Sequence, residues 1–366
     1  MQKSFDEVFE DVTKLGTKIK TDEYHPLGKY QIIDQGQEKI AGYTDLEDGL
    51  FENVPAVIFG DHTRVIKYVD KPFFLGADGV KVLRSRLENA NYRYLYYALK
   101  NVKIPNTGYN RHFKWLKEAQ INYPSVETQF EIVSTLDGVT SIIEHRQQQL
   151  QKLDELVKAR FVEMFGDLVI GNKVGTNKKR IGEIASVTKL AGFEFTKYIQ
   201  YKEHGDIIML RGLNCKKGHL ILDDIKWIDK ETSDLLPRSK LHYGDILMTY
   251  AGTIGDVAMV DANDKYHLAP NVAKITVNDM NAYNPVFLMH LFMYTNDYIM
   301  TFASVVAQAS INMEKIRGFE YYFPPIEKQN EFAAFVEQTD KSKAAIQKAM
   351  DEAQLLFDSL MQKYFG

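Results

Sequence analysis

The chain has 366 residues, which is too long for one ordinary domain and suits two or three. Its content of 45% hydrophobic and 26% charged residues is that of a folded globular protein and excludes general disorder. A single cysteine, Cys215, excludes a disulfide framework and a four-cysteine zinc module, and the net charge of −4 excludes a global attraction for nucleic acid.

The first residues and the longest apolar stretch bear on localisation. Residues 1–7 are polar and acidic and lack the apolar run of a signal peptide. The stretch Val286–Tyr294 is interrupted by His290 and is too short to span a bilayer. Together with the low cysteine content, these features predict a cytoplasmic protein with no membrane partner.

Residues 1–124 form the first expected globular segment, here called the first head. Short apolar runs bounded by turn residues predict strands over 30–34, 56–59 and 65–69. An aromatic stretch over 92–99 predicts a helix. Its tyrosines suggest a stacking surface for bases, although their helical spacing favours core packing.

Residues 125–166 predict a long helix. Apolar residues fall at every seventh position, the period of a coiled-coil seam, at Leu136, Ile143, Leu150, Val157 and Met164. About 40 residues would give a helix of roughly 60 Å. Arg146 and Arg160 interrupt the seam, so they either pair with carboxylates across the helices or contact a partner subunit.

Residues 167–180 predict a linker, clearest in the glycine, asparagine and lysine content of 171–179. Its basic run, 178–180, is either solvated or bound to phosphate. The second head follows over 181–323, with strands expected at 207–210, 245–250 and 257–260, a hairpin turn at 252–256 and a helix at 286–293. Both heads are expected to be α/β in class.

Residues 324–366 predict a second long helix with the same seam, at Val336, Ile346, Met350, Phe357, Leu360 and Tyr364. An apolar stripe on a helix needs a partner in water. Because the chain must turn back after the first helix to build the second head, we expect the two helices to pair antiparallel. The alternative is that each helix packs separately on its own head.

The chain repeats itself. Residues 123–129 return as 323–329, and this offset of 200 continues without a gap to Gly166 and Gly366. Residues 12–15, Val-Thr-Lys-Leu, return as 187–190 at an offset of 175. Each half is therefore a head of variable length followed by a helix of fixed length, and the second head is about 25 residues longer. Such a duplication predicts one shared mechanical role and two different recognition roles.

Catalytic motifs are missing from the sequence. There is no Gly-x-Gly spacing, no phosphate-binding Gly-x4-Gly-Lys-Ser/Thr loop, and no histidine followed by glutamate as in the common zinc hydrolases. The tripeptide Asp224-Ile225-Lys226 resembles part of a nuclease site but arises readily by chance. The histidines, including His62, His112 and His267, lack metal-ligand spacing. The sequence predicts neither a metal site nor catalysis.

Two divergent heads on two similar helices resemble the specificity subunit of type I restriction–modification systems. Residues 244–258 are similar to that family's glycine-rich hairpin, and 309–312 followed by 323–329 to its exit from a head into a helix. Residues 107–111 and 123–124 match this exit less closely, with Ser125 in place of a second proline, and 59–64 are similar to a turn of the family.

This resemblance implies that each head is a target recognition domain reading one half of a split, asymmetric DNA sequence. The paired helices would space the heads and dock two modification subunits. Those subunits would carry S-adenosylmethionine and methylate adenine N6, and restriction subunits, where present, would supply ATP- and Mg-dependent cleavage. The chain itself would hold no cofactor.

Base reading needs polar or cationic side chains on exposed loops. In the first head the candidates for DNA binding are His62, Thr63, Arg64, Arg84, Arg86, Asn106, Thr107, Tyr109, Asn110 and Arg111. In the second head they are Arg211, Asn214, Lys216, Lys217, Thr249, Tyr250, Thr253, Gln308, Ser310 and Asn312. For each loop, an ordinary solvated surface is the alternative.

Two other functions compete with this interpretation. One is a specificity subunit that serves a methyltransferase-only system, and the other is a coiled-coil adaptor whose heads bind proteins. The acidic net charge predicts weak, strongly salt-dependent DNA binding by the isolated chain, with tight binding only beside modification subunits.

Overall fold

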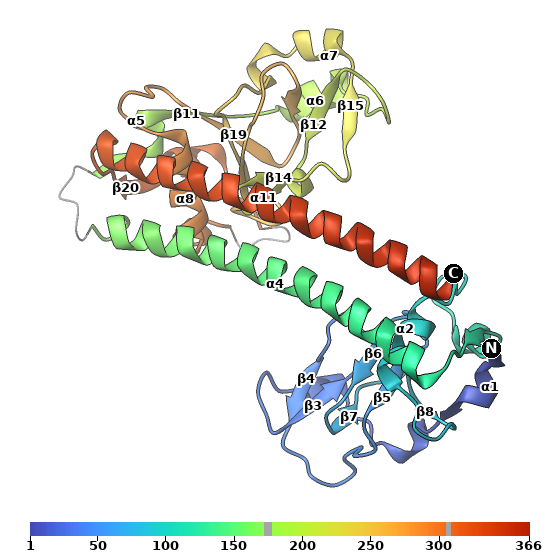
Figure 1. The fold of residues 1–366 in the computed structure, drawn as a ribbon. Coiled ribbons are helices and arrows are strands. Elements are labelled where there is room, and N and C mark those ends of the chain that lie inside the picture. Colours follow the sequence, from blue (N-terminus) through green and yellow to red (C-terminus); the bar gives the residue numbers. More distant parts are fainter. Residues whose placement is uncertain (172–177, 305–308) are drawn as a thin grey trace. The chain divides into compact units, whose positions relative to one another are not determined.

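The computed structural model describes residues 1–171, 178–304 and 309–366 (Figure 1). The chain divides into two compact units. The first comprises residues 1–148 and 347–366, and the second comprises 149–346. Each unit therefore holds one head together with part of both long helices.

The first head contains an antiparallel sheet, a smaller mixed sheet and a short strand pair. The larger sheet is antiparallel, in the order β2 (Phe9–Asp11), β8 (Val80–Ser85), β5 (Ala56–Gly60) and β6 (Ile66–Val69). In the smaller one the central strand is antiparallel to its first neighbour and parallel to its second, in the order β4 (Gly42–Thr44), β3 (Tyr30–Ile33) and β7 (Phe73–Leu75). The pair is β1 (Gln2–Ser4) with β9 (Gln120–Asn122).

Short helices complete the first head: α1 (Phe5–Val8), α2 (Tyr92–Lys100), α3 (Phe113–Lys117), and the 3-10 turns η1 (Thr13–Leu15) and η2 (Thr21–Glu23). The side chain of Asn91 caps α2 by accepting a hydrogen bond from the Tyr94 amide at 3.0 Å. Tyr94 and Tyr97 are buried in the core with Leu95. The core-packing alternative for this aromatic helix is therefore correct for these tyrosines.

The second head repeats this topology strand for strand. Its sheets run in the orders β11 (Ala185–Lys189), β19 (Val272–Val277), β16 (Ile246–Thr249), β17 (Val257–Met259), and β15 (Lys226–Ile228), β12 (Ile207–Leu210), β18 (Tyr266–Leu268). The antiparallel and parallel neighbours of β12 match those of β3. The short pair is β10 (Lys178–Arg180) with β20 (Glu320–Tyr322). The helices α5 (Ile181–Ile184), α8 (Pro285–Tyr294) and α10 (Met313–Arg317) take the places of α1, α2 and α3.

Insertions account for the greater length of the second head. They include α6 (Gly192–Tyr198), the hairpin β13 (Cys215–Lys216) and β14 (His219–Leu220), α7 (Lys230–Asp234), α9 (Asn296–Met300), and the turns η3 (Gly212–Asn214) and η4 (Pro237–Ser239). The first strands of the two heads begin at Gln2 and Lys178, 176 residues apart. The Val-Thr-Lys-Leu repeat is thus one residue out of the structural register.

The long helices are α4 (Val126–Phe165) and α11 (Ile326–Phe365), of 40 residues each (Figure 1). In the first unit, the beginning of α4 at Leu136 and Val139 shares a hydrophobic core with the end of α11 at Phe357 and Met361. In the second unit, the end of α4 shares a core with the beginning of α11, through Val157, Phe161, Phe165, Phe332 and Val336. The pairing is therefore antiparallel, as expected.

Both expected arrangements of the helices occur together, because the cores of the helix pair continue into the heads. The predicted seam residues Leu136, Val157, Val336 and Phe357 are buried, whereas the remaining ones are partly exposed: Ile143, Leu150, Met164, Ile346, Met350, Leu360 and Tyr364. Near its end α4 buries Phe161 and Phe165 in place of Met164. The reason is that Phe161 also stacks on Phe287 of α8, at 5.7 Å between ring centroids.

Two charged features noted in the sequence form ion pairs in the structure. Arg160 bonds to Glu331 across the helices, with 3.1 Å between Nη2 and Oε1. The basic run at the end of the predicted linker forms β10, where Lys178 and Arg180 both pair with Glu320, at 3.4 and 3.0 Å. These two cations are engaged by a carboxylate within the head. Residues 172–177 of that linker lie outside the described residues.

Candidate nucleic-acid interface

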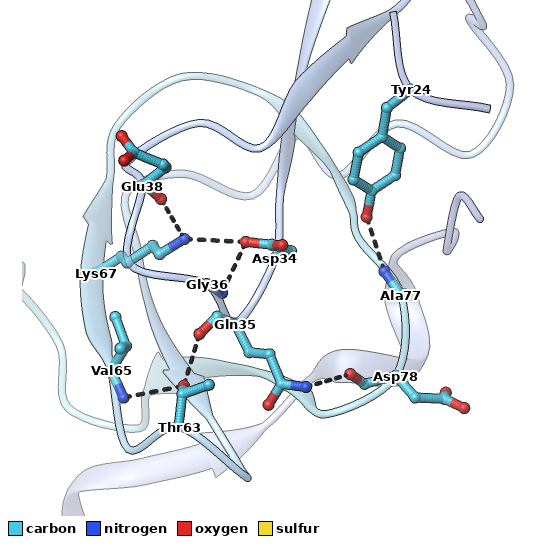
Figure 2. Close-up of polar contacts among 10 residues, drawn as sticks. All are labelled: Tyr24, Asp34, Gln35, Gly36, Glu38, Thr63, Val65, Lys67, Ala77 and Asp78. Atoms are coloured by element: carbon cyan, nitrogen blue, oxygen red, sulfur yellow. Dashed lines mark hydrogen bonds and ion pairs between the residues drawn. The ribbon is translucent and has the colours of Figure 1, made fainter. Parts of the chain in front are cut away.

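In the first head, the turn between β5 and β6 is fixed by hydrogen bonds to Gln35, which follows β3. The Thr63 hydroxyl donates to the Gln35 carbonyl oxygen at 2.6 Å, and the Gln35 side-chain amide donates to the Asp78 carbonyl oxygen at 2.9 Å (Figure 2). The His62 amide donates to the Gln35 side-chain oxygen at 3.1 Å. One glutamine thus ties together the loops that follow β3, β5 and β7.

The side-chain ammonium of Lys67 stabilises the turn that follows β3. Lys67 on β6 is buried, and its Nζ lies 3.3 Å from the Asp34 carboxylate and 2.6 Å from the Glu38 carbonyl oxygen (Figure 2). Burial lowers the pKa of the Lys67 ammonium, and the Asp34 carboxylate opposes this by favouring the charged form. Asp34 also accepts the Gly36 amide at 2.8 Å, so the turn after β3 is held from both sides.

The second candidate loop of the first head joins this cluster through Asp61. The buried Asp61 accepts the Phe113 amide on its carboxylate at 2.7 Å and the His112 amide on its carbonyl oxygen at 2.8 Å. Two segments separated by about 45 residues of sequence, 61–64 and 106–112, are thereby brought together. We call these two segments, with residues 34–36 and 76–79, the first loop cluster.

The exposed face of this cluster carries most of the candidates in the first head. The Tyr109 ring is 86% exposed and stacks on the His62 ring. Asn106 accepts the Gly108 amide at 3.2 Å, and Asn110 donates to Thr107, so these side chains partly serve the loop itself. Thr63 and Arg111 are also exposed. The cluster presents ring edges, amides and cations of the kinds that contact base edges and phosphates.

Arg84 and Arg86 lie apart from this cluster, near the other end of β8. Val80, the first residue of β8, pairs with Gly60, whereas Arg84 pairs with Glu10 on β2. Four residues of strand separate the two positions by about 13 Å. Arg86 donates to the Phe9 carbonyl oxygen at 3.1 Å. The structure does not bring these two arginines to the loops that carry the other candidates.

The second head brings an equivalent pair of loops together. Its hairpin turn between β16 and β17 meets the segment before α10, because Ala251 and Ser310 form a β-bridge and the Ile311 amide donates to the Tyr250 carbonyl oxygen at 2.8 Å. Tyr250, Thr253 and Ser310 therefore lie on one local surface, the second loop cluster. Gln308 lies outside the described residues.

The β13–β14 hairpin adds a third segment, which holds the candidates Lys216 and Lys217 and whose hairpin structure the sequence analysis did not predict. Lys217 and Gly218 form its turn with positive φ values of 49° and 86°, the conformation of a tight hairpin. The Gly218 amide donates to the Val257 carbonyl oxygen at 2.8 Å, which fixes the hairpin beside β17. Lys216 and Lys217 are exposed at its tip. The lysine–glycine pair was the available signal for this turn.

Two candidates of the second head are buried and form hydrogen bonds inside it. Asn214 is fully buried, accepting the Arg211 amide at 3.0 Å and donating to the Ile221 and Asp224 carbonyl oxygens at 2.7 and 2.9 Å. Thr249 is also fully buried and accepts the Asp256 amide at 3.0 Å inside the hairpin. The interpretation of these residues as base-reading is corrected, because their polar groups are already paired away from solvent.

Two further candidates have partners within the chain. Arg211 pairs with Asp224 at 2.8 Å through Nη2. Asn312 caps α10 by accepting the Lys315 amide at 2.8 Å. Asn312 and His112 occupy the same position of the 200-residue repeat, and each precedes the short helix of its head.

Metal-binding groups do not gather in the part of the chain that the structure describes. In that part, no set of three or more His, Cys, Asp or Glu side chains is arranged to hold a metal ion. Cys215 is buried, and burial raises the pKa of its thiol to about 12, which keeps it protonated. Among the described residues, no helix is long and apolar enough to cross a membrane.

Comparison with known proteins gives the same pattern of two equivalent segments. The sequence matches the family described as type I restriction modification DNA specificity domain twice, over residues 2–155 and 173–355. The chain belongs to this family. As a type I specificity protein, it serves DNA sequence recognition and is a non-catalytic subunit.

Two curated relatives come from Escherichia coli. The specificity subunit of the type I restriction enzyme EcoBI is 26% identical over 159 residues, which is 43% of this chain and only 33% of that protein. The specificity subunit of EcoR124I/EcoR124II is 23% identical over 357 residues, covering 91% of this chain and 84% of that protein. The match to the EcoR124I/EcoR124II subunit therefore includes both heads and both long helices.

Solved structures share the fold. A type I S subunit from M. genitalium aligns over 100% of this chain and 96% of its own, with a TM-score of 0.57 and 15% identity. A chain from a structural study of complex assembly and conformational transition in a type I system aligns over 100% and 97%, with a TM-score of 0.56 and 16% identity. The two-headed, two-helix architecture is thus that of type I specificity subunits.

Proposed function

We propose that each head of this type I specificity subunit reads one half of a split, non-palindromic DNA target. The observation that carries the proposal is that the same two loops meet in each head, yet with different side chains on their surfaces. The first loop cluster carries His62, Tyr109 and Arg111, and the second carries Tyr250, Thr253 and Ser310. Equivalent surfaces with different chemistry are suited to two different half-sites.

The paired helices α4 and α11 would set the spacing of the half-sites. Two reading modules meet the same face of a duplex only at separations near one helical turn, roughly 34 Å, or a multiple of it. A packed helix pair holds such a spacing, whereas a flexible linker does not.

The same helices are the proposed docking surface for two modification subunits. Within the first unit, they expose the apolar side chains of Phe130, Ile142, Leu355 and Leu356, and within the second unit those of Leu156 and Val162. Exposed apolar side chains on packed helices are typical of a protein interface. Those subunits would hold S-adenosylmethionine and methylate adenine N6, and restriction subunits would bring ATP and Mg. The assembly would act in the cytoplasm.

Genome-wide detection of N6-methyladenine in the host, with and without this gene, tests the proposal. Loss of a single split, non-palindromic motif on deletion would support it and would define both half-sites. An unchanged methylation map, together with failure of this chain to co-purify with modification subunits, would reject it. Neighbouring genes distinguish a restriction system from a methyltransferase-only system, and charge reversal at Arg111 and Lys217 without effect would favour a protein-binding adaptor.

A further inference from the structure

A groove of about 550 Å³ adjoins the first loop cluster. It is lined by residues of β6, α2 and the first half of α4, all within the first unit. Five of its lining residues are cationic, namely Lys39, Arg64, Lys67, Arg93 and Lys100, and one is acidic, Glu144. The groove is therefore strongly basic in a chain whose net charge is −4.

The five cations divide into two kinds. Lys67 and Arg93 are engaged by carboxylates, Lys67 by Asp34 at 3.3 Å and Arg93 by Asp137 at 2.8 Å. Among the carboxylates of the described residues (1–171, 178–304 and 309–366), none has an oxygen within 4.0 Å of the cationic nitrogens of Lys39, Arg64 or Lys100. These three charges are available to an anionic partner.

Arg64 connects the groove to the loop cluster. Its φ of 64° lies in the left-handed region, which is strained for a residue other than glycine. The turn maintains this conformation through hydrogen bonds from the Arg64 amide to the Gly60 carbonyl oxygen at 2.7 Å and from the Gly60 amide to the Val65 carbonyl oxygen at 2.8 Å. The side chain donates to the Ile104 carbonyl oxygen at 3.4 Å. A single residue thus belongs both to the proposed reading surface and to the groove.

The tyrosines of the groove favour phosphates over bases as the occupant. The Arg93 guanidinium lies 4.9 Å from the centroid of the Tyr68 ring and 5.5 Å from that of Tyr96, and Lys100 Nζ lies 5.8 Å from that of Tyr96. Tyr97 is buried. Because side-chain cations already cover these rings, base stacking of the kind that binds single strands lacks a platform.

We propose that this groove binds the sugar–phosphate backbone of duplex DNA beside the half-site read by the first head. Lys39, Arg64 and Lys100 contact phosphates, while Lys67 and Arg93 hold the groove walls. This inference rests on the proposed function. It assigns to the groove a contribution to affinity and position that is independent of base sequence.

The test uses the complete complex of this chain with its modification subunits. The double variant Lys39→Gln/Lys100→Gln removes two charges, and Lys20→Gln/Lys71→Gln removes two exposed lysine charges elsewhere in the first head. Binding to duplexes with and without the target motif is measured over a range of salt concentrations. Each lost phosphate contact reduces the log–log slope by about 0.9, so we expect a reduction of about 1.8 on both duplexes.

The control variant should retain the wild-type slope, and Lys39→Arg/Lys100→Arg should restore it. A wild-type slope for Lys39→Gln/Lys100→Gln, or a reduction confined to the duplex that carries the motif, would overturn the groove assignment. Failure of the wild-type complex to bind its methylated motif would instead count against the proposed function, so the two failures are distinguishable.

Discussion

The His62 ring lies parallel to the Tyr109 ring, with 4.6 Å between centroids and 8° between planes. The two residues come from different loops, and the buried Asp61 holds these loops together through the amides of His112 and Phe113. The exposed tyrosine is therefore positioned by a residue that is itself inaccessible to DNA. This arrangement separates the proposed reading surface from the hydrogen bonds that orient it.

Replacing Tyr109 by alanine should impair recognition without loss of stability. Its ring is 86% exposed, so little buried area is lost, whereas a lost specific base contact costs about 1–3 kcal/mol. We expect methylation of the native target to fall by about tenfold or more, with an unchanged Tm. Tyr243→Ala removes a 68% exposed tyrosine that precedes β16, at the end of that strand opposite Thr249, and serves as the control. Equal methylation by wild type and Tyr109→Ala would contradict the role of this ring.

Removing the Asp61 carboxylate should disturb both stability and reading of one half-site. Asp61→Ala leaves the Phe113 amide without its 2.7 Å acceptor, at a cost of about 1–3 kcal/mol. The methylated motif should become degenerate in the half read by the first head and stay intact in the other half. Asp61→Asn retains a side-chain oxygen and should retain most of the function. Sequencing of methylated sites together with thermal unfolding measures both effects, and degeneracy in both halves would argue against separate heads.

The sequence predicts secondary structure better than it predicts which polar side chains face solvent. Strand runs such as 30–34 and 207–210, the helix over 92–99 and the pairing of the long helices follow from hydrophobic period, and the structure confirms them. The polar candidates Asn214 and Thr249 were misread because Asn and Thr are equally suited to capping a turn and to facing solvent. Only the fold decides between these roles.

The groove was beyond sequence reasoning for a different reason. Lys39, Arg64 and Lys100 are separated by tens of residues, and no local pattern marks them as neighbours. Their proximity depends on the pairing of β5 with β6 and on the packing of α2 against that sheet. Likewise, Phe161 replaces Met164 in the core because α8 packs against α4 there. The heptad pattern of α4 alone does not predict that contact.

Asn312 tests whether a candidate for base reading acts as a helix cap. Its side-chain oxygen accepts the Lys315 amide at 2.8 Å, and loss of such a cap costs about 1 kcal/mol. Asn312→Ala should lower the Tm of the second unit, whereas Asn312→Asp retains the acceptor and should restore both stability and methylation. If Asn312→Asp is stable yet fails to direct methylation, the amide itself contacts DNA and the capping role is insufficient.

His290 should make the stability of the second unit depend on pH. Its Nδ1 lies 2.8 Å from the Val286 carbonyl oxygen, to which only a protonated ring nitrogen can donate. Burial lowers the pKa of this imidazole to about 4, while the weaker effects of Asp340 and Lys343 have opposite signs. The folded state therefore holds the neutral ring at pH 5, whereas the unfolded chain, with a pKa near 6.5, binds a proton.

Because the unfolded state binds more protons, the free energy of unfolding should fall as pH decreases from about 6.5 towards 4, by up to about 1.4 kcal/mol per pH unit. Between pH 6.5 and 5 this amounts to about 1.6 kcal/mol, because the unfolded imidazole is only half protonated at pH 6.5. His290→Gln keeps a donor for the Val286 carbonyl oxygen but does not titrate, so its unfolding free energy should vary less over this range. Burial also lowers the pKa of His267, so this histidine adds to the pH dependence that remains. Denaturant unfolding at pH 7, 6 and 5 measures the difference, and identical pH dependence in wild type and His290→Gln would show that His290 is not the titrating group.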